Sequence, residues 1–238
     1  MPALAACTLD STVTPVSTLT PAAMVLVSGG AQWGAAGNTL PSPVVIRVTD
    51  QSGVPLSGAV VTFTPAASSG TVGAAALLTD TTGSAGTMWT LGTALGTDSL
   101  SVSVSGVPTI TVTATVTTGS PDSIVVVSGT GQWAPAGTTL NAPFVVRVTD
   151  QFGYAVTNAR VSWNNDAGGT FAYASSVTDT DGSAQAVYTL GAGAGVQHAT
   201  VMVSTAAGAM LATISVTSYR VVTAASHLAP GSPRDASP

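Results

Sequence analysis

Side chains that could perform chemistry are scarce and dispersed in this sequence. The chain has two histidines, one cysteine, ten aspartates and five arginines, and it has no lysine and no glutamate. A catalytic site needs a nucleophile, a base and a group that orients the base. His198 is expected to face outward on a strand and His227 lies near the C-terminus, so no such set can be assembled. With no Gly-x-Ser-x-Gly or His-Glu-x-x-His motif either, the sequence predicts a protein that is not an enzyme and has no cofactor.

One aspartate-rich segment has the residue types of a metal site. Asp179-Thr180-Asp181-Gly182 is similar to part of a calcium-binding loop. Calcium takes six or more oxygen ligands, and no third carboxylate lies nearby in the sequence. The otherwise similar segment Asp80-Thr81-Thr82-Gly83 lacks the second aspartate. We therefore interpret both segments as turns in which an aspartate side chain caps the backbone, and we predict no metal site.

Two arginine–aspartate pairs, Arg47 with Asp50 and Arg147 with Asp150, have the charges of a binding site. On a strand, residues three positions apart point to opposite faces of the sheet. Neither pair therefore forms one site. We interpret each aspartate as the first residue of a turn and each arginine as the cover of a loop.

The elements that must position these residues occur twice, at an offset of about one hundred residues, and a repeat of that length is a whole small domain. The residues that recur are Gln32-Trp33, Arg47-Val48-Thr49-Asp50-Gln51 and Gly53, as Gln132-Trp133, Arg147-Val148-Thr149-Asp150-Gln151 and Gly153. The predicted organisation is an extended N-terminal tether at 1–20, a domain at 21–118, a second domain at 119–218 and a low-complexity tail at 219–238.

Hydrophobic alternation indicates strands throughout both domains. Leu100, Val102 and Val104 alternate with serines, which is typical of a half-buried antiparallel strand. Hydrophobic residues make up 45% of the chain and charged residues only 6%, and the missing lysine and glutamate argue against surface helices. Each domain has about seven such segments, among them one strand expected at 84–91 and one at 183–190, with a Gly-rich loop expected at 29–40. The predicted fold class is all-β: two tandem immunoglobulin-like β-sandwiches with extended N- and C-terminal tails.

The charge distribution excludes one class of partner. The formal net charge is −5 and the arginines are scattered, so no basic patch is available for the phosphates of a nucleic acid. No apolar run approaches the roughly 20 residues of a membrane-spanning helix.

Large aromatic residues divide into two groups. Trp89, Tyr188 and Trp163 occupy strand positions that are predicted to be in the core. Trp33 and Trp133 lie in the expected Gly-rich loops, where we interpret them as lids over the end of a sandwich. If these indoles are exposed instead, they would contact a partner, and Tyr154 is a third candidate for such a contact.

The residues around the only cysteine are similar to a lipidation site. Leu4-Ala5-Ala6-Cys7 is similar to the site at which a bacterial lipoprotein signal is cut and its cysteine acylated. Only three residues precede it, so the charged and apolar regions of a signal peptide are missing. Either translation starts upstream and Cys7 carries a lipid that contacts the membrane, or Cys7 is a free thiol in an Ala-rich segment.

The repeated pattern resembles the bacterial immunoglobulin-like domain group 1 (Big-1) of invasin- and intimin-type surface proteins over roughly residues 19–218. The residues that carry the resemblance in the first copy are Ser28-Gly29, Gln32, Gly37, Pro43-Val44-Val45-Ile46-Arg47-Val48-Thr49-Asp50, Gly53, Pro55, Gly58, Val60 to Phe63, Gly70-Thr71, Thr79-Asp80, Gly83, Trp89-Thr90-Leu91-Gly92 and Gly96. The second copy matches over Ser128 to Gly195. The resemblance implies extracytoplasmic, non-catalytic sandwiches that act as stalks, spacers or binding platforms.

Two main functional hypotheses follow, and a carbohydrate-binding sandwich ranks third, because only Trp33, Trp133 and Tyr154 could form the exposed aromatic platform that it needs. Without lysine the sheet edges are poorly protected against other proteins, and two domains make a stalk of only about 80 Å. These features favour a structural subunit that packs against the protein subunits of a larger membrane assembly, photosynthetic, respiratory or of another kind, on its periplasmic or outer side. The alternative is a cell-surface adhesion or stalk protein of the invasin and intimin type.

Overall fold

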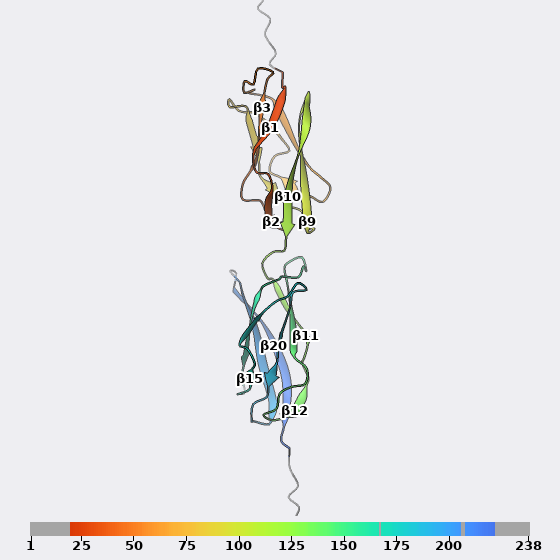
Figure 1. Cartoon of the computed structure of the whole chain (residues 1–238), viewed down its shortest axis with the longest axis vertical. Helices are drawn as coiled ribbons and strands as arrows, with labels where there is room; N and C mark the ends of the chain where they lie inside the picture. Colours follow the sequence, from red (N-terminus) through yellow and green to blue (C-terminus); the bar gives the residue numbers. More distant parts are fainter. Residues whose placement is uncertain (1–19, 167, 206–207, 222–238) are drawn as a thin grey trace, which may run out of the picture. The chain divides into compact units, whose positions relative to one another are not determined.

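The computed structural model describes residues 20–166, 168–205 and 208–221. Cys7, His227 and most of the two predicted tails lie outside the described residues. The described part of the chain is all-β and contains no helix that could span a membrane. It divides between Thr117 and Thr118 into two compact units, called module 1 and module 2 here (Figure 1).

Module 1 contains ten strands in its described residues. They are β1 (Ala23–Ser28), β2 (Gln32–Ala35), β3 (Val44–Thr49), β4 (Val60–Pro65), β5 (Thr71–Val72), β6 (Ala76–Leu78), β7 (Ser84–Thr87), β8 (Trp89–Thr90), β9 (Gly96–Val104) and β10 (Val107–Thr117). One sheet has the order β1-β3-β7 and the other the order β2-β10-β9-β4-β6, while β5 pairs with β8. Module 1 is therefore a sandwich of a three-stranded and a five-stranded sheet.

Module 2 repeats this arrangement. Its strands are β11 (Ser123–Ser128), β12 (Trp133–Pro135), β13 (Phe144–Thr149), β14 (Arg160–Asn165), β15 (Thr170–Phe171), β16 (Ser175–Val177), β17 (Ser183–Ala186), β18 (Tyr188–Thr189), β19 (Gly195–Thr205) and β20 (Gly208–Tyr219). The sheets have the orders β11-β13-β17 and β12-β20-β19-β14-β16, with β15 paired to β18. The two predicted tandem sandwiches are confirmed.

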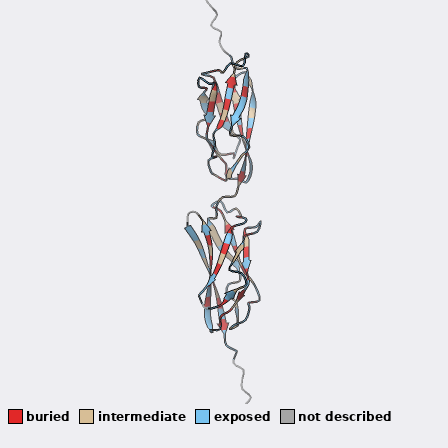
Figure 2. Ribbon diagram, turned by 60° about the vertical axis from the view of Figure 1, so that its left-hand side comes forward, coloured by how far each residue is buried: buried red, intermediate tan, exposed pale blue. Residues whose placement is uncertain are grey.

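The core of each module comes from the alternation seen in the sequence. Along β9, Leu100, Val102 and Val104 are buried, and the two serines between them lie on the other face of the sheet. Figure 2 shows the same change from buried to exposed along strands of both modules. Trp89 in module 1 and both Tyr188 and Trp163 in module 2 are buried in the cores, as predicted.

The structure differs from the prediction in the segment expected to be a Gly-rich loop. Residues 32–35 form β2, which pairs in parallel with the end of β10. The chain leaves the three-stranded sheet at a bulge after Leu26 and crosses at Gly29, whose φ of 85° is unfavourable for other residues. A β-carbon at Gly29 would also collide with the backbone of Pro43. This crossing was not visible in the hydrophobic pattern, because β2 is short and contains a glycine.

Two segments predicted as single strands are each divided. The segment 84–91 forms β7 and β8, and the segment 183–190 forms β17 and β18. In each case the chain leaves the three-stranded sheet and pairs with a separate short strand. The backbone amide of Gly73 donates to the Met88 carbonyl at 2.9 Å, which fixes this change of partner in module 1.

The chain enters and leaves module 1 at opposite ends. Pro21 lies next to Gly106, in the turn where β10 begins, and Ala22 donates its amide to the Thr49 carbonyl at 2.9 Å. The module ends at Thr117, at the other end of β10. A strand of this length spans about 36 Å.

Module 2 has the same polarity. Pro121 and Asp122 line one small depression together with Gly208 and Met210, which lie at the start of β20. The described chain leaves the sheet at Tyr219, where β20 ends. The β20 strand runs one residue into the segment predicted as the C-terminal tail.

Candidate functional site

The Gln-Trp dipeptide is repeated in the two modules, and its two residues have different roles: the glutamine holds a loop in place and the tryptophan is exposed. The Gln32 side chain donates to the carbonyls of Gly29 and Ser42 at 3.0 and 2.9 Å and accepts from the Ser42 amide at 3.1 Å. Gln132 makes the equivalent bonds in module 2. The glutamine thus holds the crossing loop against the start of the next strand, and the residue after it is directed outward.

The tryptophans do not cover the sandwich ends, so the lid interpretation is wrong. Trp33 and Trp133 are each 73% exposed. Trp33 lies opposite Thr115 and Trp133 opposite Thr217, both on the outer face of a five-stranded sheet. The physical reason is the register with β10 and β20, in which the inward positions are already occupied by Val116 and Ser218. That these indoles contact a partner remains a prediction.

Trp133 has an aromatic neighbour that Trp33 lacks. The ring centroids of Trp133 and Tyr219 are 5.5 Å apart and the rings are inclined at 46°. The module 1 position equivalent to Tyr219 is Thr117, because it pairs with Ala35 as Tyr219 pairs with Pro135. An exposed aromatic pair is therefore specific to module 2.

Tyr154, the third predicted contact residue, is only half-buried and lies in the turn that follows β13. Its amide donates to Oδ1 of Asp150 at 2.9 Å, and the amide of Phe152 donates to the same atom at 3.0 Å. Oδ2 of Asp150 accepts from the amide of Gly119 at 2.9 Å. Asp150 is thus the turn-initiating residue that the sequence predicted, and it also fixes the segment between the modules to module 2.

The aspartate turns and the arginines have the structural roles expected for them. Oδ1 of Asp179 accepts from the amides of Asp181 and Ser183, each at 2.9 Å. Arg147 donates from Nε to the Asp181 carbonyl at 3.1 Å, and Arg47 makes the same contact with Thr82. In module 1, a hydrogen bond from the Thr82 hydroxyl, followed by the amides of Ser84 and Thr82, lowers the pKa of Asp80.

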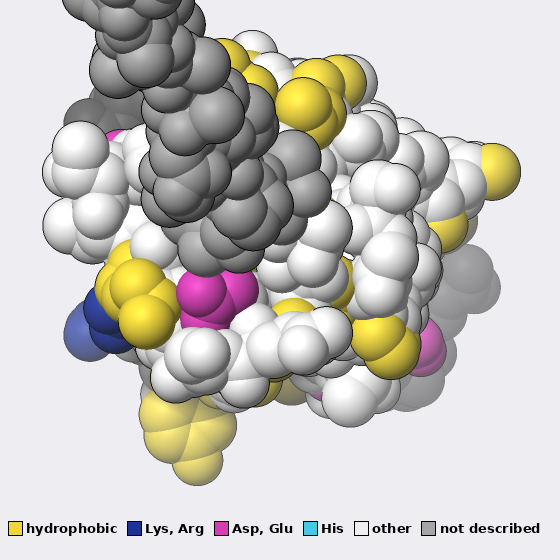
Figure 3. Space-filling model, turned by 90° about the horizontal axis from the view of Figure 1, so that it is seen from above, with side chains coloured by type: hydrophobic (Ala, Val, Ile, Leu, Met, Phe, Trp, Pro, Cys, Tyr) yellow, Lys and Arg dark blue, Asp and Glu magenta, His cyan; other side chains and the backbone are white. Residues whose placement is uncertain are grey.

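The described residues contain no group of three or more His, Cys, Asp or Glu side chains that could hold a metal ion. His198 is exposed on β19, and its Nδ1 lies 2.9 Å from the Ser215 hydroxyl. Viewed from the end at which the chain enters module 1, charged side chains are scattered among uncharged ones (Figure 3).

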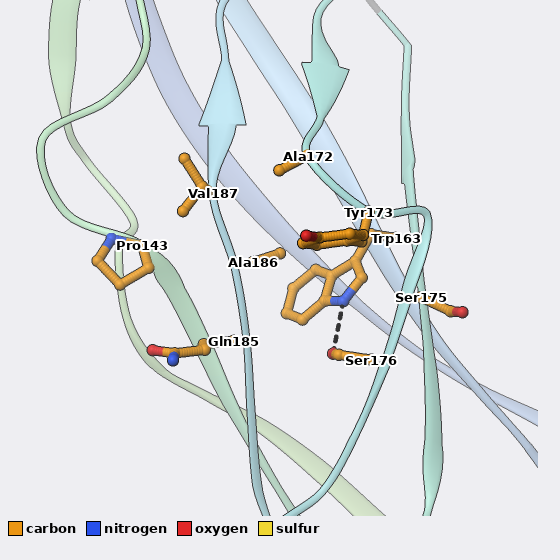
Figure 4. A pocket seen from close by; sticks show the side chains of 9 residues that line it. All are labelled: Pro143, Trp163, Ala172, Tyr173, Ser175, Ser176, Gln185, Ala186 and Val187. Atoms are coloured by element: carbon orange, nitrogen blue, oxygen red, sulfur yellow. Dashed lines mark hydrogen bonds between the residues drawn. The ribbon is translucent and has the colours of Figure 1, made fainter.

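Module 2 has a cavity of about 270 Å³ beside β16 and β17, at the edges of its two sheets. Trp163 and Tyr173 lie on one side of it and Pro143 and Gln185 on the other (Figure 4). The indole nitrogen of Trp163 donates to the Ser176 hydroxyl at 3.0 Å. The hydrophobic pattern of module 2 does not reveal this cavity, but an alignment of the two modules does: Leu77, which packs against the core of module 1, stands where module 2 has Ser176.

No protein-family profile and no curated protein matches this chain. Among solved structures, the Escherichia coli adhesin FdeC is similar, with a TM-score of 0.54 at 18% identity over 82% of this chain and 63% of that one. The chain has the tandem immunoglobulin-like fold of such adhesins. The other similar structures include InvD of Yersinia pseudotuberculosis (TM-score 0.49, 22% identity, 87% of this chain and 60% of that one) and domains D0-D1 of intimin (TM-score 0.33, 15% identity, 83% and 99%). The chain spans about three fifths of the FdeC and InvD structures.

The predicted resemblance to the immunoglobulin-like domains of bacterial adhesins is thus confirmed at the level of the fold by the similarity to FdeC. The predicted contact residues are divided between the modules, and the two in module 2 come from different elements. Trp33 belongs to module 1, whereas Trp133 lies on β12 and Tyr154 in the turn after β13. Cys7, the predicted lipidation site, lies outside the described residues.

The two immunoglobulin-like modules should respond differently to alkali. Burial raises the pKa of the Tyr188 phenol above its usual value of 10.0. The folded state therefore holds this proton more tightly than the unfolded state, and its contribution to stability is complete below pH 10 and is lost as the pH rises further. Module 1 has Trp89 at this position. We expect the denaturant concentration at the unfolding midpoint to decrease above pH 10 for module 2 but not for module 1. Tyr188→Phe should remove most of this decrease, as measured by NMR-detected unfolding.

Proposed function

We propose that the chain is a non-catalytic extracytoplasmic spacer of a cell-surface adhesion protein of the invasin and intimin type. The observation that carries this proposal is the polarity of each module, in which the chain enters beside the start of the last strand and leaves at its far end. A domain with this polarity adds the length of its strands to the distance between whatever precedes and follows it. The fold shared with FdeC supports the same role.

The chemistry of the described residues supports the non-catalytic part of the proposal. Asp50, Asp150 and Asp179 use carboxylate oxygens to close turns, and Asp98 accepts from the amide of Gly92 at 2.7 Å. These carboxylates serve the backbone rather than a substrate. The exposed His198 has the Ser215 hydroxyl as its side-chain partner, and the Asp166 carboxylate accepts from its backbone amide.

Small-angle X-ray scattering tests the spacer role directly. The tandem protein and the isolated segments 20–117 and 118–221 would be measured under the same conditions. A spacer should show a maximum dimension that exceeds that of a single module by about one strand length, roughly 36 Å. A tandem protein that is scarcely longer than one module would contradict the proposal.

A structural subunit of a larger membrane assembly is the second candidate. It is favoured by exposed valines on the outer strands of the three-stranded sheets, since Val25, Val27, Val125 and Val127 are each more than half exposed at equivalent positions of β1 and β11. Exposed aliphatic side chains in a row are suited to packing against other protein subunits. Acylation of Cys7 would add a membrane contact.

One experiment separates the two candidates. Intact source cells would be treated with protease, and the chain would then be detected with an antibody. Digestion on intact cells is expected for a surface spacer. Protection until the envelope is opened, together with stoichiometric co-purification with an integral membrane complex, would instead support the structural subunit. Mass spectrometry of the mature N-terminus would show in either case whether Cys7 carries a lipid.

A further inference from the structure

The outer face of module 2 presents an exposed aromatic pair, Trp133 and Tyr219, that packing within the module does not explain. The Trp133 side chain is 73% exposed, and Tyr219 is 39% exposed. Leaving an indole of this size in water forgoes the stabilisation that its burial would bring. The two rings are inclined at 46°, so together they form an open V rather than a closed stack.

The surroundings of the aromatic pair combine hydroxyl groups with one exposed aliphatic side chain, because Val196, 61% exposed, lies opposite Thr217. Two charged residues are close by: Arg220 directly follows Tyr219, and Oδ1 of Asp166 accepts from the His198 amide at 2.9 Å. Thr217 lies opposite Trp133, and the next residue pair on this face of β19 and β20 is His198 with Ser215. His198 and Ser215 are joined through Nδ1 and the hydroxyl, which leaves Nε2 of the exposed imidazole free to bond a ligand. Strands β12, β19 and β20 contain no Asp, Glu, Lys or Arg.

We propose that this face binds a neutral glycan, with one pyranose ring resting on Trp133 and Tyr219. A pyranose has an apolar face of C–H groups, which matches an exposed aromatic ring, and a rim of hydroxyl groups, which matches Thr217 and His198. An anionic glycan or a nucleic acid would find no cation on these three strands, and Arg220, which directly follows β20, is a single charge rather than a cluster. The proposal goes beyond the spacer role and does not depend on it, because a spacer needs no exposed rings.

Module 1 is a built-in comparison for this site. Trp33 is exposed to the same extent as Trp133 and also lies on a face rich in hydroxyl groups. It lacks the second ring, because Thr117 stands where module 2 has Tyr219. Module 1 should therefore bind the same glycan more weakly, and the substitution Thr117→Tyr should strengthen that binding.

NMR of the tandem protein provides the test, because the chain has four tryptophans and each indole N–H gives one signal. The probes are cellotetraose, maltotetraose, mannotetraose and chitotetraose, with sialyllactose as the anionic comparison and a fluorescent naphthalene sulfonate as a general apolar probe. At least one neutral tetrasaccharide should move the Trp133 signal while the buried Trp89 and Trp163 signals stay in place. Trp133→Ala should weaken binding about tenfold and Tyr219→Ala by a smaller factor.

Several results would overturn the proposal. These are no movement of the Trp133 signal with any neutral tetrasaccharide, binding that persists unchanged in Trp133→Ala, or movement with the apolar probe alone. The last outcome would point to a protein partner instead. Unchanged Trp89 and Trp163 signals in each variant show that the modules remain folded, and Thr117→Tyr supplies a gain of binding at Trp33 that a folding defect cannot imitate.

Discussion

Trp89→Ala is expected to destabilise module 1 by about 3–5 kcal/mol and to leave module 2 folded. Trp89 is fully buried in the core of module 1, and its indole nitrogen donates to the Ser69 carbonyl at 2.8 Å. The substitution removes the largest side chain of this core and leaves a buried carbonyl without its donor. A small domain has about 5–15 kcal/mol of stability, so the loss is a large fraction of the total.

Denaturant unfolding followed by NMR would measure this effect, because signals of each module report separately. The midpoint for module 1 should fall sharply while that for module 2 stays unchanged. Trp33→Ala is the matched control: it removes the same side chain from an exposed position and should change stability by less than about 0.5 kcal/mol. Equal losses in the two variants would show that the assignment of core and surface is wrong.

Asp150→Ala should cost module 2 about 3 kcal/mol of unfolding free energy, because the carboxylate accepts three backbone amides and hydrogen bonds to charged groups are strong. The side chain is only 3% exposed. Its loss would leave the amides of Phe152 and Tyr154 without an acceptor and would release Gly119 from the module.

The equivalent change in module 1, Asp50→Ala, is the comparison. Asp50 is half-buried and accepts from the amides of Ser52 and Val54. We expect a loss of about 1–2 kcal/mol there. Hydrogen exchange at Gly119 should accelerate in Asp150→Ala. If exchange at Gly119 does not change, the carboxylate does not hold the segment between the modules.

The fold was predictable from the sequence where packing alone determines the structure. Leu100, Val102 and Val104 alternate with serine because one face of β9 is dry and the other is wet, and that difference is recorded directly in the residue types. Trp89 and Tyr188 could be assigned to the cores of their modules because the two sequences align at these positions. The turns at Asp50 and Asp179 were predictable because an aspartate with a glycine three residues later favours a turn locally.

The surface features depended on long-range register and could not be predicted in the same way. Whether Trp33 covers an end or faces water depends on its pairing with Thr115, which is 82 residues away in the sequence (115 minus 33). Trp133 and Tyr219 meet only because β12 runs parallel to the last residues of β20. No local pattern encodes such a pairing. The cavity beside Ser176 likewise arises from the loss of one leucine relative to module 1, which a single copy would not reveal.

The parallel pairing of β2 with β10 has a mechanical consequence. If a module is pulled from its two ends, β10 and the segment β1–β2 are drawn in opposite directions along their own axes. The backbone hydrogen bonds between β2 and β10 are then loaded in shear, so they share the load and must rupture together rather than one after another. Four residue pairs join β2 to β10 in module 1 and three join β12 to β20 in module 2. In module 2 the amide of Thr217 also donates to the Gln132 carbonyl at 2.9 Å, which extends the contact beyond the three pairs, so each module should resist stretching until the whole contact ruptures.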